Sequence, residues 1–397
     1  MNKHTRIHTV DGIRGFSLFG ILLANMLIFQ YGLWGKDEIH LFELPAIDQY
    51  TYGFTKIFIE GSFMPIFTFL FGYSMVMMKN SLEKKNVRVK WHLFRRMIML
   101  IIIGLLHSIY LWEGDILLLY GAMGILLLMF VNRKPKTILI WGVSLFLLFG
   151  IGSFFGEEEL QQTDADYIQG YVEKTTEIYR SGTYVEIKEY RNNSEEDPMT
   201  KELGESGAVL LVFLVPLVIA PMFLFGMYAA KRKMFFRPYK EKQFYWIGFT
   251  LCLPVGLLLN VIGYFFTESN WAIGLAMIGE MILAFGYIFL IALMYCHRSK
   301  FRILTYLENI GKLSLTNYIM QTVICTTIFY GYGFALFGRA GVTDGILLGI
   351  VIFALQMYFS TLYVNYFRYG PLEKITRIVT YLSFLKFNKK RTKEKVA

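Results

Sequence analysis

The chain has 397 residues, of which 55% are hydrophobic and only 18% are charged, and its mean hydropathy is +0.44. A soluble protein of this length needs more charge on its surface, so the composition excludes soluble globular, disordered and collagen-like chains. Apolar runs of about 20 residues recur, and each is long enough to cross the hydrocarbon layer of a membrane. The three cysteines lack metal-binding spacing, and no metal is expected.

These runs predict an all-α, polytopic integral membrane protein with about ten transmembrane helices. The expected spans are residues 13–33, 54–78, 94–112, 115–131, 137–155, 207–230, 244–266, 271–296, 312–334 and 343–366. We expect one membrane domain overall. Its parts are five helices in 1–155 that carry the candidate catalytic residues, an acidic insert at 156–206, and five helices with a basic tail in 207–397.

The distribution of charge predicts the orientation of these helices. With the N-terminus in the cytoplasm, the inner segments contain 32 of the 40 Lys and Arg residues, and the outer segments contain 24 of the 30 Asp and Glu residues. Both termini are therefore expected to be cytoplasmic, in a bacterial cell membrane. The net charge of +10 is explained by orientation and by contact with anionic membrane lipids, and no nucleic acid partner is expected.

The insert at 156–206 is strongly acidic. It is either a solvated external loop with short helices around residues 167–190, or a lid or recognition surface for an external acceptor.

Polar residues inside a membrane are costly to bury, so each is a candidate site. Asn25 and His107 lie at similar depth, about 16–18 Å along their helices from the inner end. Histidine is suited to accept and return a proton, and Glu113 and Asp115 follow closely enough to orient its imidazole. A purely structural role for His107 is the alternative. Glu280 lies near the same depth and either faces a polar cavity or is a neutral, hydrogen-bonded side chain.

Basic and polar residues also gather at the expected inner ends of the spans. Arg14, Arg95 and Arg96 are candidates for binding phosphate groups, although Arg14 also shares a helical face with Asp11. Three further candidates for donor binding are Asn317, Gln321 and Arg368. Asn317 and Gln321 are four residues apart, so they could equally form hydrogen bonds between helices, and Arg368 could simply precede a helix break.

Several stretches together resemble the YeiB-like family, domain of unknown function 418. They are Asp11-Gly-Ile-Arg14-Gly with Asn25, Phe69-Leu-Phe-Gly72, His107 followed by Gly114-Asp115-Ile-Leu, Gly311-Lys-Leu-Ser-Leu-Thr-Asn317-Tyr-Ile-Met-Gln321, and Arg368-Tyr-Gly370-Pro371-Leu-Glu373. They run almost from end to end of the chain.

More distantly, the first span resembles the transmembrane acyltransferase superfamily. Asn25 follows Arg14 by eleven residues, which is similar to the heparan-α-glucosaminide acetyltransferase branch, whereas the acyltransferase-3 branch has a histidine near that position. The heparan-α-glucosaminide acetyltransferase branch also has a second helix with an acid ahead of Phe, Pro and Gly, as found here in Glu60, Phe63, Pro65 and Gly72. The resemblance implies transfer of an acyl group from cytoplasmic acyl-CoA to an acceptor at the outer face.

Two functions follow as hypotheses. The first is a membrane acyltransferase that uses acyl-CoA, with His107 as general base and Asn25 as oxyanion donor. In the branch that the first span resembles, the catalytic histidine lies soon after that Asn, and His40, the nearest histidine after Asn25, is therefore the second choice for the base. The acceptor could be a small molecule, a glycan or a lipid, and oligomerisation is left open. The alternative is a proton-coupled secondary transporter with a plan of five plus five helices.

Overall fold

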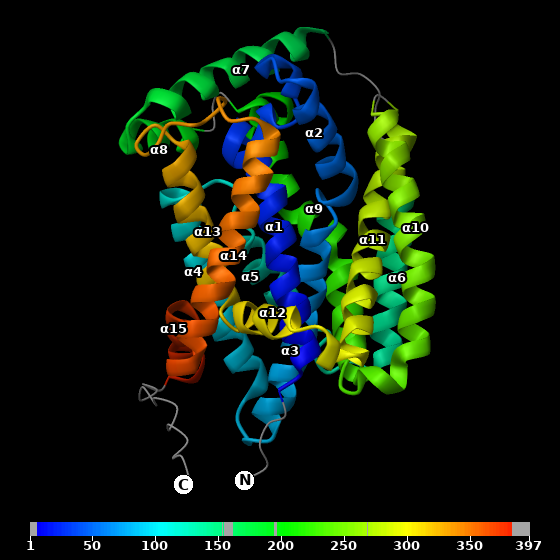
Figure 1. The fold of residues 1–397 in the computed structure, drawn as a ribbon. Coiled ribbons are helices and arrows are strands. Elements are labelled where there is room, and N and C mark those ends of the chain that lie inside the picture. The colour runs from blue at the N-terminus through cyan, green and yellow to red at the C-terminus, as the bar shows by residue number, and fades with distance from the viewer. Residues whose placement is uncertain (1–5, 153, 155–161, 194–196, 268, 383–397) are drawn as a thin grey trace.

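The computed structural model describes residues 6–152, 154, 162–193, 197–267 and 269–382, although not the side chains of 162–165, 199 and 202–216. Every regular element in this part of the chain is a helix (Figure 1). The α-helices are α1 (His8–Gly35), α2 (Ala46–Phe58), α3 (Phe63–Glu83), α4 (Val89–Tyr110), α5 (Leu117–Leu127), α6 (Pro135–Gly152), α7 (Gln162–Ser181), α8 (Tyr184–Asn192), α9 (Pro198–Lys231), α10 (Lys242–Phe265), α11 (Asn270–Cys296), α12 (Ile303–Lys312), α13 (Ser314–Phe329), α14 (Val342–Tyr366) and α15 (Pro371–Tyr381). Three short 3-10 helices are η1 (Ile39–Phe42), η2 (Pro238–Glu241) and η3 (Arg298–Lys300).

Seven helical stretches in the described residues are long and apolar enough to cross a membrane. They are His8–Gly35, Ala46–Glu83, Val89–Tyr110, Pro135–Gly152, Pro238–Phe265, Asn270–Cys296 and Val342–Tyr366. The other three expected spans coincide with α5, α9 and α13, of which α5 and α13 are short and α9 is apolar over Leu217–Lys231 in its described part. The prediction of a helical, multi-pass membrane protein is confirmed.

The second expected span, 54–78, differs from the structure because two helices meet within it. α2 ends at Phe58 and α3 begins at Phe63, with Gly61 between them in the left-handed region at φ +71°. Glycine adopts this conformation without steric cost. The carbonyl groups freed by the break accept hydrogen bonds from Tyr287, to Phe58 at 2.8 Å, and from Asn260, to Ile57 at 3.0 Å. Side chains of neighbouring helices therefore supply hydrogen bonds to the carbonyl groups at the break, as a membrane interior requires.

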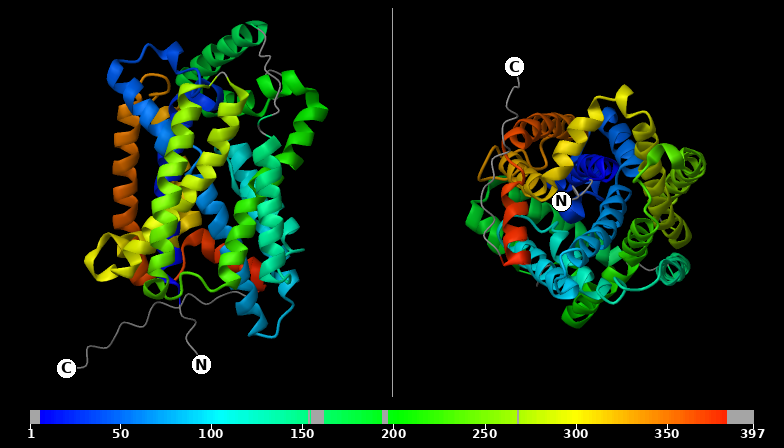
Figure 2. Two further views of the ribbon diagram at one scale, coloured as in Figure 1. Left: turned by 90° about the vertical axis from the view of Figure 1, so that its right-hand side faces the viewer. Right: turned by 90° about the horizontal axis from the view of Figure 1, so that it is seen from below.

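α1 forms the centre of the bundle. It is mostly apolar, and its buried residues extend from Thr9 to Gly35, which is typical of a helix that is surrounded by others. Seen from the end where the termini lie, α1 sits inside a ring of helices, and the α10–α11 hairpin lies outside this ring (Figure 2). Side chains on α1 can therefore contact several helices at once.

The acidic insert packs onto the bundle at the end opposite the termini (Figure 1). Arg180 of α7 donates hydrogen bonds to the carbonyl oxygens of Phe337 and Gly338, at 3.0 and 3.2 Å. Arg191 of α8 donates to the carbonyl oxygens of Leu111 and Ile109, at 3.0 and 2.9 Å. The expected short helices are present, and these bonds make α7 and α8 an anchored cap. Residues 156–161 and 194–196 of the insert lie outside the described residues.

α1 and α12 cross at close range near the start of α1. A side chain at Gly15 would collide with the carbonyl oxygen of Leu307, and one at Gly311 would collide with the carbonyl oxygen of Asp11. α12 turns Leu307 and Glu308 toward α1 as well. The two backbones touch because neither crossing position carries a side chain.

We predict that Gly15→Leu lowers the free energy of unfolding by about 1–3 kcal/mol or more, because the new side chain would force α12 away from α1. The measurement is thermal or denaturant unfolding in detergent. Gly170→Leu on α7 is the matched control, since nothing lies within 4 Å of a side chain added there. Equal effects of the two substitutions would contradict the proposed close crossing.

Candidate functional site

A cavity of about 640 Å³ lies at the end of the bundle where α1 begins and α15 packs. Its polar rim is strongly cationic, with seven basic residues and two acidic ones. The basic residues are Arg6, Arg14, Lys85, Arg96, Lys312, Arg368 and Arg377, and the acidic residues are Asp11 and Glu373. An excess of positive charge in a concave site attracts anions such as phosphate groups.

Many of the other lining residues are apolar, and several of them come from the interior of the bundle. It includes Phe67, Leu70, Met97, Leu117 and Tyr120. The site therefore combines a cationic mouth with an apolar interior, which suits a ligand that has an anionic head and a less polar arm.

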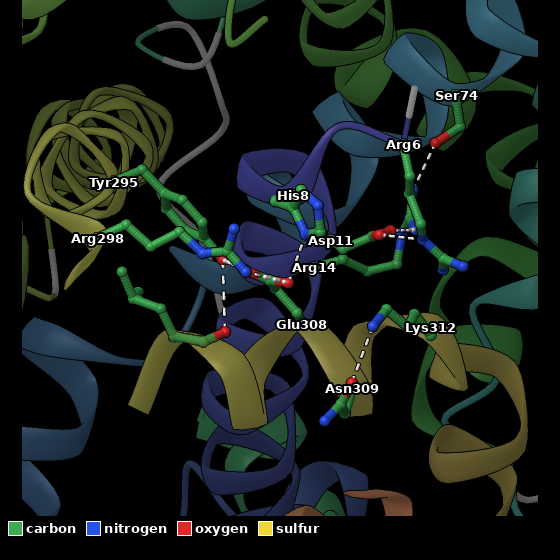
Figure 3. A network of polar contacts seen from close by, with 11 residues as sticks. Arg6, His8, Asp11, Arg14, Ser74, Tyr295, Arg298, Glu308, Asn309 and Lys312 are labelled. Carbon is green, nitrogen blue, oxygen red and sulfur yellow. Dashed lines mark hydrogen bonds and ion pairs between the residues drawn. The ribbon is translucent and has the colours of Figure 1, made fainter. Parts of the chain in front are cut away.

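Arg14 is fixed by partners on both sides. It donates to Asp11 at 3.3 Å and to Ser74 Oγ of α3 at 2.7 Å, and Asp11 also pairs with Arg6 (Figure 3). Arg14 can thus present a preoriented guanidinium group to the cavity. The sequence prediction that Arg14 and Asp11 form a local ion pair describes one part of this arrangement.

Glu308 forms a second polar cluster beside the cavity (Figure 3). It is buried, and its carboxylate contacts His8 at 2.6 Å, Arg298 at 2.7 Å and Tyr295 at 3.1 Å. A buried carboxylate is stable when it is paired and hydrogen-bonded in this way. The cluster holds α11, α12 and the start of α1 together.

Arg96 differs from Arg14 because it has no ion-pair partner among the described residues. Its guanidinium lies 3.9 Å from Met78 Sδ, which is a weak acceptor. Arg14 and Arg377 repel its charge, and Glu373 attracts it. Arg96 is thus a partly buried cation in the cavity wall that an anionic ligand would stabilise.

Glu373 links α15 to the first turn of α13. Its carboxylate accepts hydrogen bonds from the backbone N–H groups of Leu315 and Thr316, at 2.8 and 3.1 Å, and from Thr316 Oγ1 at 2.6 Å. A carboxylate at a helix N-terminus satisfies free donors and interacts favourably with the helix dipole. This contact places Arg368 and Arg377 of the same segment at the cavity.

His107 and Asp115 are brought together as predicted. His107 is 2% exposed, its Nδ1 lies 2.9 Å from Asp115 Oδ1, and its Nε2 lies 2.9 Å from Thr322 Oγ1 of α13. With the carboxylate as acceptor, Nδ1 donates to Asp115, and Nε2 accepts from the Thr322 hydroxyl. His107 does not line the cavity, but its ring lies 5.4 Å from that of Tyr318, which does.

Glu113 lies under the cap rather than beside His107. Tyr179 donates to its Oε1 at 3.1 Å, and Arg191 Nε lies 3.8 Å from its Oε2. Burial raises the pKa of Glu113 above its usual range, and the charge of Arg191 offsets this effect only in part.

Asn317 and Gln321 form hydrogen bonds between helices. Asn317 donates to Ser360 Oγ at 3.0 Å and Gln321 donates to Gln356 Oε1 at 2.9 Å, both on α14. Neither lines the cavity. The structure therefore places both residues in the role of holding α13 against α14.

Four other candidates do not line the cavity. Asn25 is half-buried on α1, His40 is exposed in η1, and Arg95 lies over the ring of Trp91 at 6.0 Å. The carboxyl group of Glu280 lies against Gly61, at the break between α2 and α3. None of the four is among the residues that line the cavity. The described residues contain no group of His, Cys, Asp or Glu suited to hold a metal ion.

Several cavity residues were missed from sequence, notably Lys85, Lys312, Arg377 and Tyr120. They belong to four different helices or helix ends, so no spacing in the sequence connects them. Glu373 could have been found, because it closes the Arg368-Tyr-Gly370-Pro371-Leu-Glu373 motif.

We predict that Arg96→Met raises the free energy of unfolding of the ligand-free protein by about 1 kcal/mol, because it removes a partly buried charge that lacks a counterion. Chemical denaturation in detergent measures the change. A clear loss of stability would contradict the absence of a partner for Arg96.

We also predict that the stability of the cap depends on pH through Glu113. Its pKa is higher in the folded than in the unfolded chain, so its favourable contribution is present below the unfolded pKa and is lost as pH rises through the folded pKa. Glu113→Gln, which cannot ionise, should show a smaller fall in melting temperature between about pH 4 and pH 8. Identical pH profiles for the two proteins would contradict this assignment.

Comparison with known proteins finds relatives over almost the whole chain. The family model described as "Protein of unknown function (DUF418)" matches residues 229–383, which include the α12–α15 side of the cavity. The protein named "Uncharacterized protein YxaH" of Bacillus subtilis (strain 168) is 32% identical over 97% of this chain and 96% of its own length. "Uncharacterized protein YeiB" of Escherichia coli (strain K12) is 27% identical over 94% and 95% of the two chains.

A third relative, the "Uncharacterized 39.9 kDa protein in amylase 3'region" of Bacillus acidopullulyticus, is 26% identical over 95% of this chain and 94% of its own. The similarity thus covers the central helix, the cap and the cavity together. The chain belongs to the YeiB-like DUF418 family of membrane proteins.

Proposed function

We propose that this protein is a membrane acyltransferase that binds cytoplasmic acyl-CoA in the cationic cavity and transfers the acyl group, most simply acetyl, to an acceptor at the opposite face. The observation that supports this proposal is the cavity itself, in which seven basic residues surround the mouth of an apolar interior. An acyl-CoA has the matching form, since its phosphates are anionic and its pantetheine arm is less polar.

The proposed binding mode follows from the geometry of the cavity. Arg14, Arg96 and Arg377 would bind phosphate oxygens, with Arg14 preoriented by Asp11 and Ser74. The arm would extend along the apolar wall toward Leu117 and Tyr318. An arm of roughly 15–20 Å is similar to the span of ten to thirteen residues in a helix.

The proposed transfer step uses His107 as general base. An acceptor hydroxyl or amine attacks the thioester carbon, its proton passes to Nε2 of His107, and the C–S bond breaks. The thiolate of CoA then takes up the proton. Asp115 would orient the imidazole through Nδ1, and Thr322, which occupies Nε2 in the ligand-free protein, would either relay the proton or give way to the acceptor.

The orientation that this mechanism needs has N- and C-termini in the cytoplasm of a bacterial cell, with ten spans. The distribution of charge supports it, because 32 of the 40 Lys and Arg residues fall on the side of the termini. Figure 1 draws the start of α1 and α15 at one end and the acidic cap at the other. The acceptor could be a glycan, a lipid or a small molecule.

A proton-coupled transporter is the second candidate, and one observation favours it. Glu280 lies against Gly61 beside an ion-paired cluster, in which Lys36 contacts Glu60 at 2.7 Å and Lys56 contacts Glu60 at 2.6 Å. Carboxylates in such positions are typical of proton relays.

Calorimetry with acetyl-CoA and the purified protein tests the first proposal. We predict saturable binding that Arg96→Met weakens by about tenfold or more, since it removes a charge from the cavity. Arg95→Met is the matched control, because it removes the adjacent charge outside the cavity and should leave binding unchanged. His107→Ala should retain binding.

The outcomes separate the two candidates. Absence of binding of any acyl-CoA at millimolar concentration would overturn the donor site and favour the transporter. Equal loss in the Arg95 and Arg96 variants would show attraction by overall charge rather than a specific site.

A further inference from the structure

A second concave site lies near the start of α4, at the same end of the bundle as the cationic cavity. It is an open groove between the first two turns of α4 and the segment that follows α5. Leu93, Arg96 and Met97 of α4 line the cavity instead, so the groove and the cavity lie on different faces of this helix. The groove combines two cations, an amide and apolar side chains, and its lining includes Arg88, Lys90, Asn132, Trp91, Phe94 and Leu128.

The charge around the groove is all of one sign along the chain. The segments 84–112 and 116–156 contain no acidic residue, whereas six basic residues fall within 84–96 and three within 133–136. Among the described residues, no side chain caps the start of α4, so its free backbone N–H groups add to the positive potential. A concave site with this charge attracts an anion.

A stacked pair of aromatic rings forms one wall of the groove. The ring centroids of Trp91 and Phe94 are 5.6 Å apart, and the guanidinium of Arg95 lies 6.0 Å from the Trp91 ring. Trp91 is 54% exposed. An exposed tryptophan at the end of a membrane-spanning helix typically lies at the level of the lipid headgroups, because its ring is amphipathic. The groove is therefore open to the headgroup layer.

The face of α4 that carries Trp91 continues as an exposed apolar stripe. Ile102, Leu105 and Ile109 follow Trp91 by 11, 14 and 18 residues, which places them on the same helical face, and all three are exposed. α4 is long and apolar enough to cross the membrane, so this stripe faces hydrocarbon. A ligand in the groove thus has a cationic pocket for its head and a membrane-facing track for its chain.

We propose that this groove binds one anionic phospholipid, such as phosphatidylglycerol, in the leaflet on the side of the termini. Arg88 and Lys90 pair with the phosphate, and the Asn132 amide donates a hydrogen bond to the phosphate or to the glycerol oxygens. One acyl chain lies along Phe94 and the exposed stripe of α4. A zwitterionic lipid binds less well because its headgroup amine is repelled by the same cations. The inference does not depend on the proposed acyl transfer.

Fluorescence quenching by brominated lipids in detergent micelles tests this site on the full chain. The chain has six Trp residues, so the signal of Trp91 is the difference between the wild type and Trp91→Phe. We expect brominated phosphatidylglycerol to quench this signal at a mole fraction about fivefold or more below that needed with brominated phosphatidylcholine. Arg88→Gln combined with Lys90→Gln should raise the phosphatidylglycerol mole fraction at half-saturation by about tenfold.

Arg237→Gln combined with Lys240→Gln is the matched control. It removes the same charge from exposed positions between α9 and α10 that line neither the groove nor the cavity, and it should leave the half-saturation point unchanged. Arg88 and Lys90 are exposed as well, so their replacement should leave the melting temperature of the lipid-free protein unchanged.

Three outcomes would overturn the lipid site. Equal quenching by the two brominated lipids would show ordinary contact with the bilayer, and equal effects of the two double variants would show attraction by overall charge. Relief of quenching by millimolar inorganic phosphate would indicate a site for a free anion rather than for a lipid.

Acetyl-CoA calorimetry on the same variants keeps this inference separate from the proposed function. Arg88 and Lys90 do not line the cavity, so their double variant should lose the preference for phosphatidylglycerol and retain acetyl-CoA binding. A preference for phosphatidylglycerol in a protein that binds no acyl-CoA would support the lipid groove and contradict the acyltransferase.

Discussion

The close crossing of α1 and α12 is the constraint on which the functional end of the molecule depends. Gly15 and Gly311 let the two backbones touch, and this contact brings Asp11 and Arg14 of α1 beside Lys312 of α12. Helices in lipid gain little from apolar burial against one another, so close packing of small residues is an effective way to fix their distance. A wider crossing would separate the charged groups that form the mouth of the cavity.

Charge compensation divides this end of the molecule into two kinds of site. Glu308 is fully paired by His8, Arg298 and Tyr295, so it serves to hold helices together. Arg96, which lines the cavity, has no ion-pair partner among the described residues. A buried charge whose partners are all supplied by the protein stabilises the fold, whereas a charge without partners can still form an ion pair with a ligand.

Individual residues show how far sequence reasoning could reach. His107 and Asp115 are eight residues apart on either side of a tight turn, so their pairing depends on local geometry and was predictable. Arg95 and Arg96 are neighbours of the same type, yet only Arg96 lines the cavity, because a helix turns successive side chains by about 100°. Asn317 and Gln321 share a helical face, but that face meets α14 rather than the cavity. Sequence spacing predicts depth and face, and it does not predict what the face contacts.

The sequence by itself determined that this is a helical, multi-pass membrane protein, because span length and composition are local properties set by the thickness and polarity of the bilayer. Its motifs also identified the YeiB-like family. Only the tertiary structure decided which polar residues share a site. The cavity combines side chains from Arg6 to Tyr381. These groups meet through helix packing, which depends on the rotation of each helix about its axis and on contacts between residues far apart in the chain.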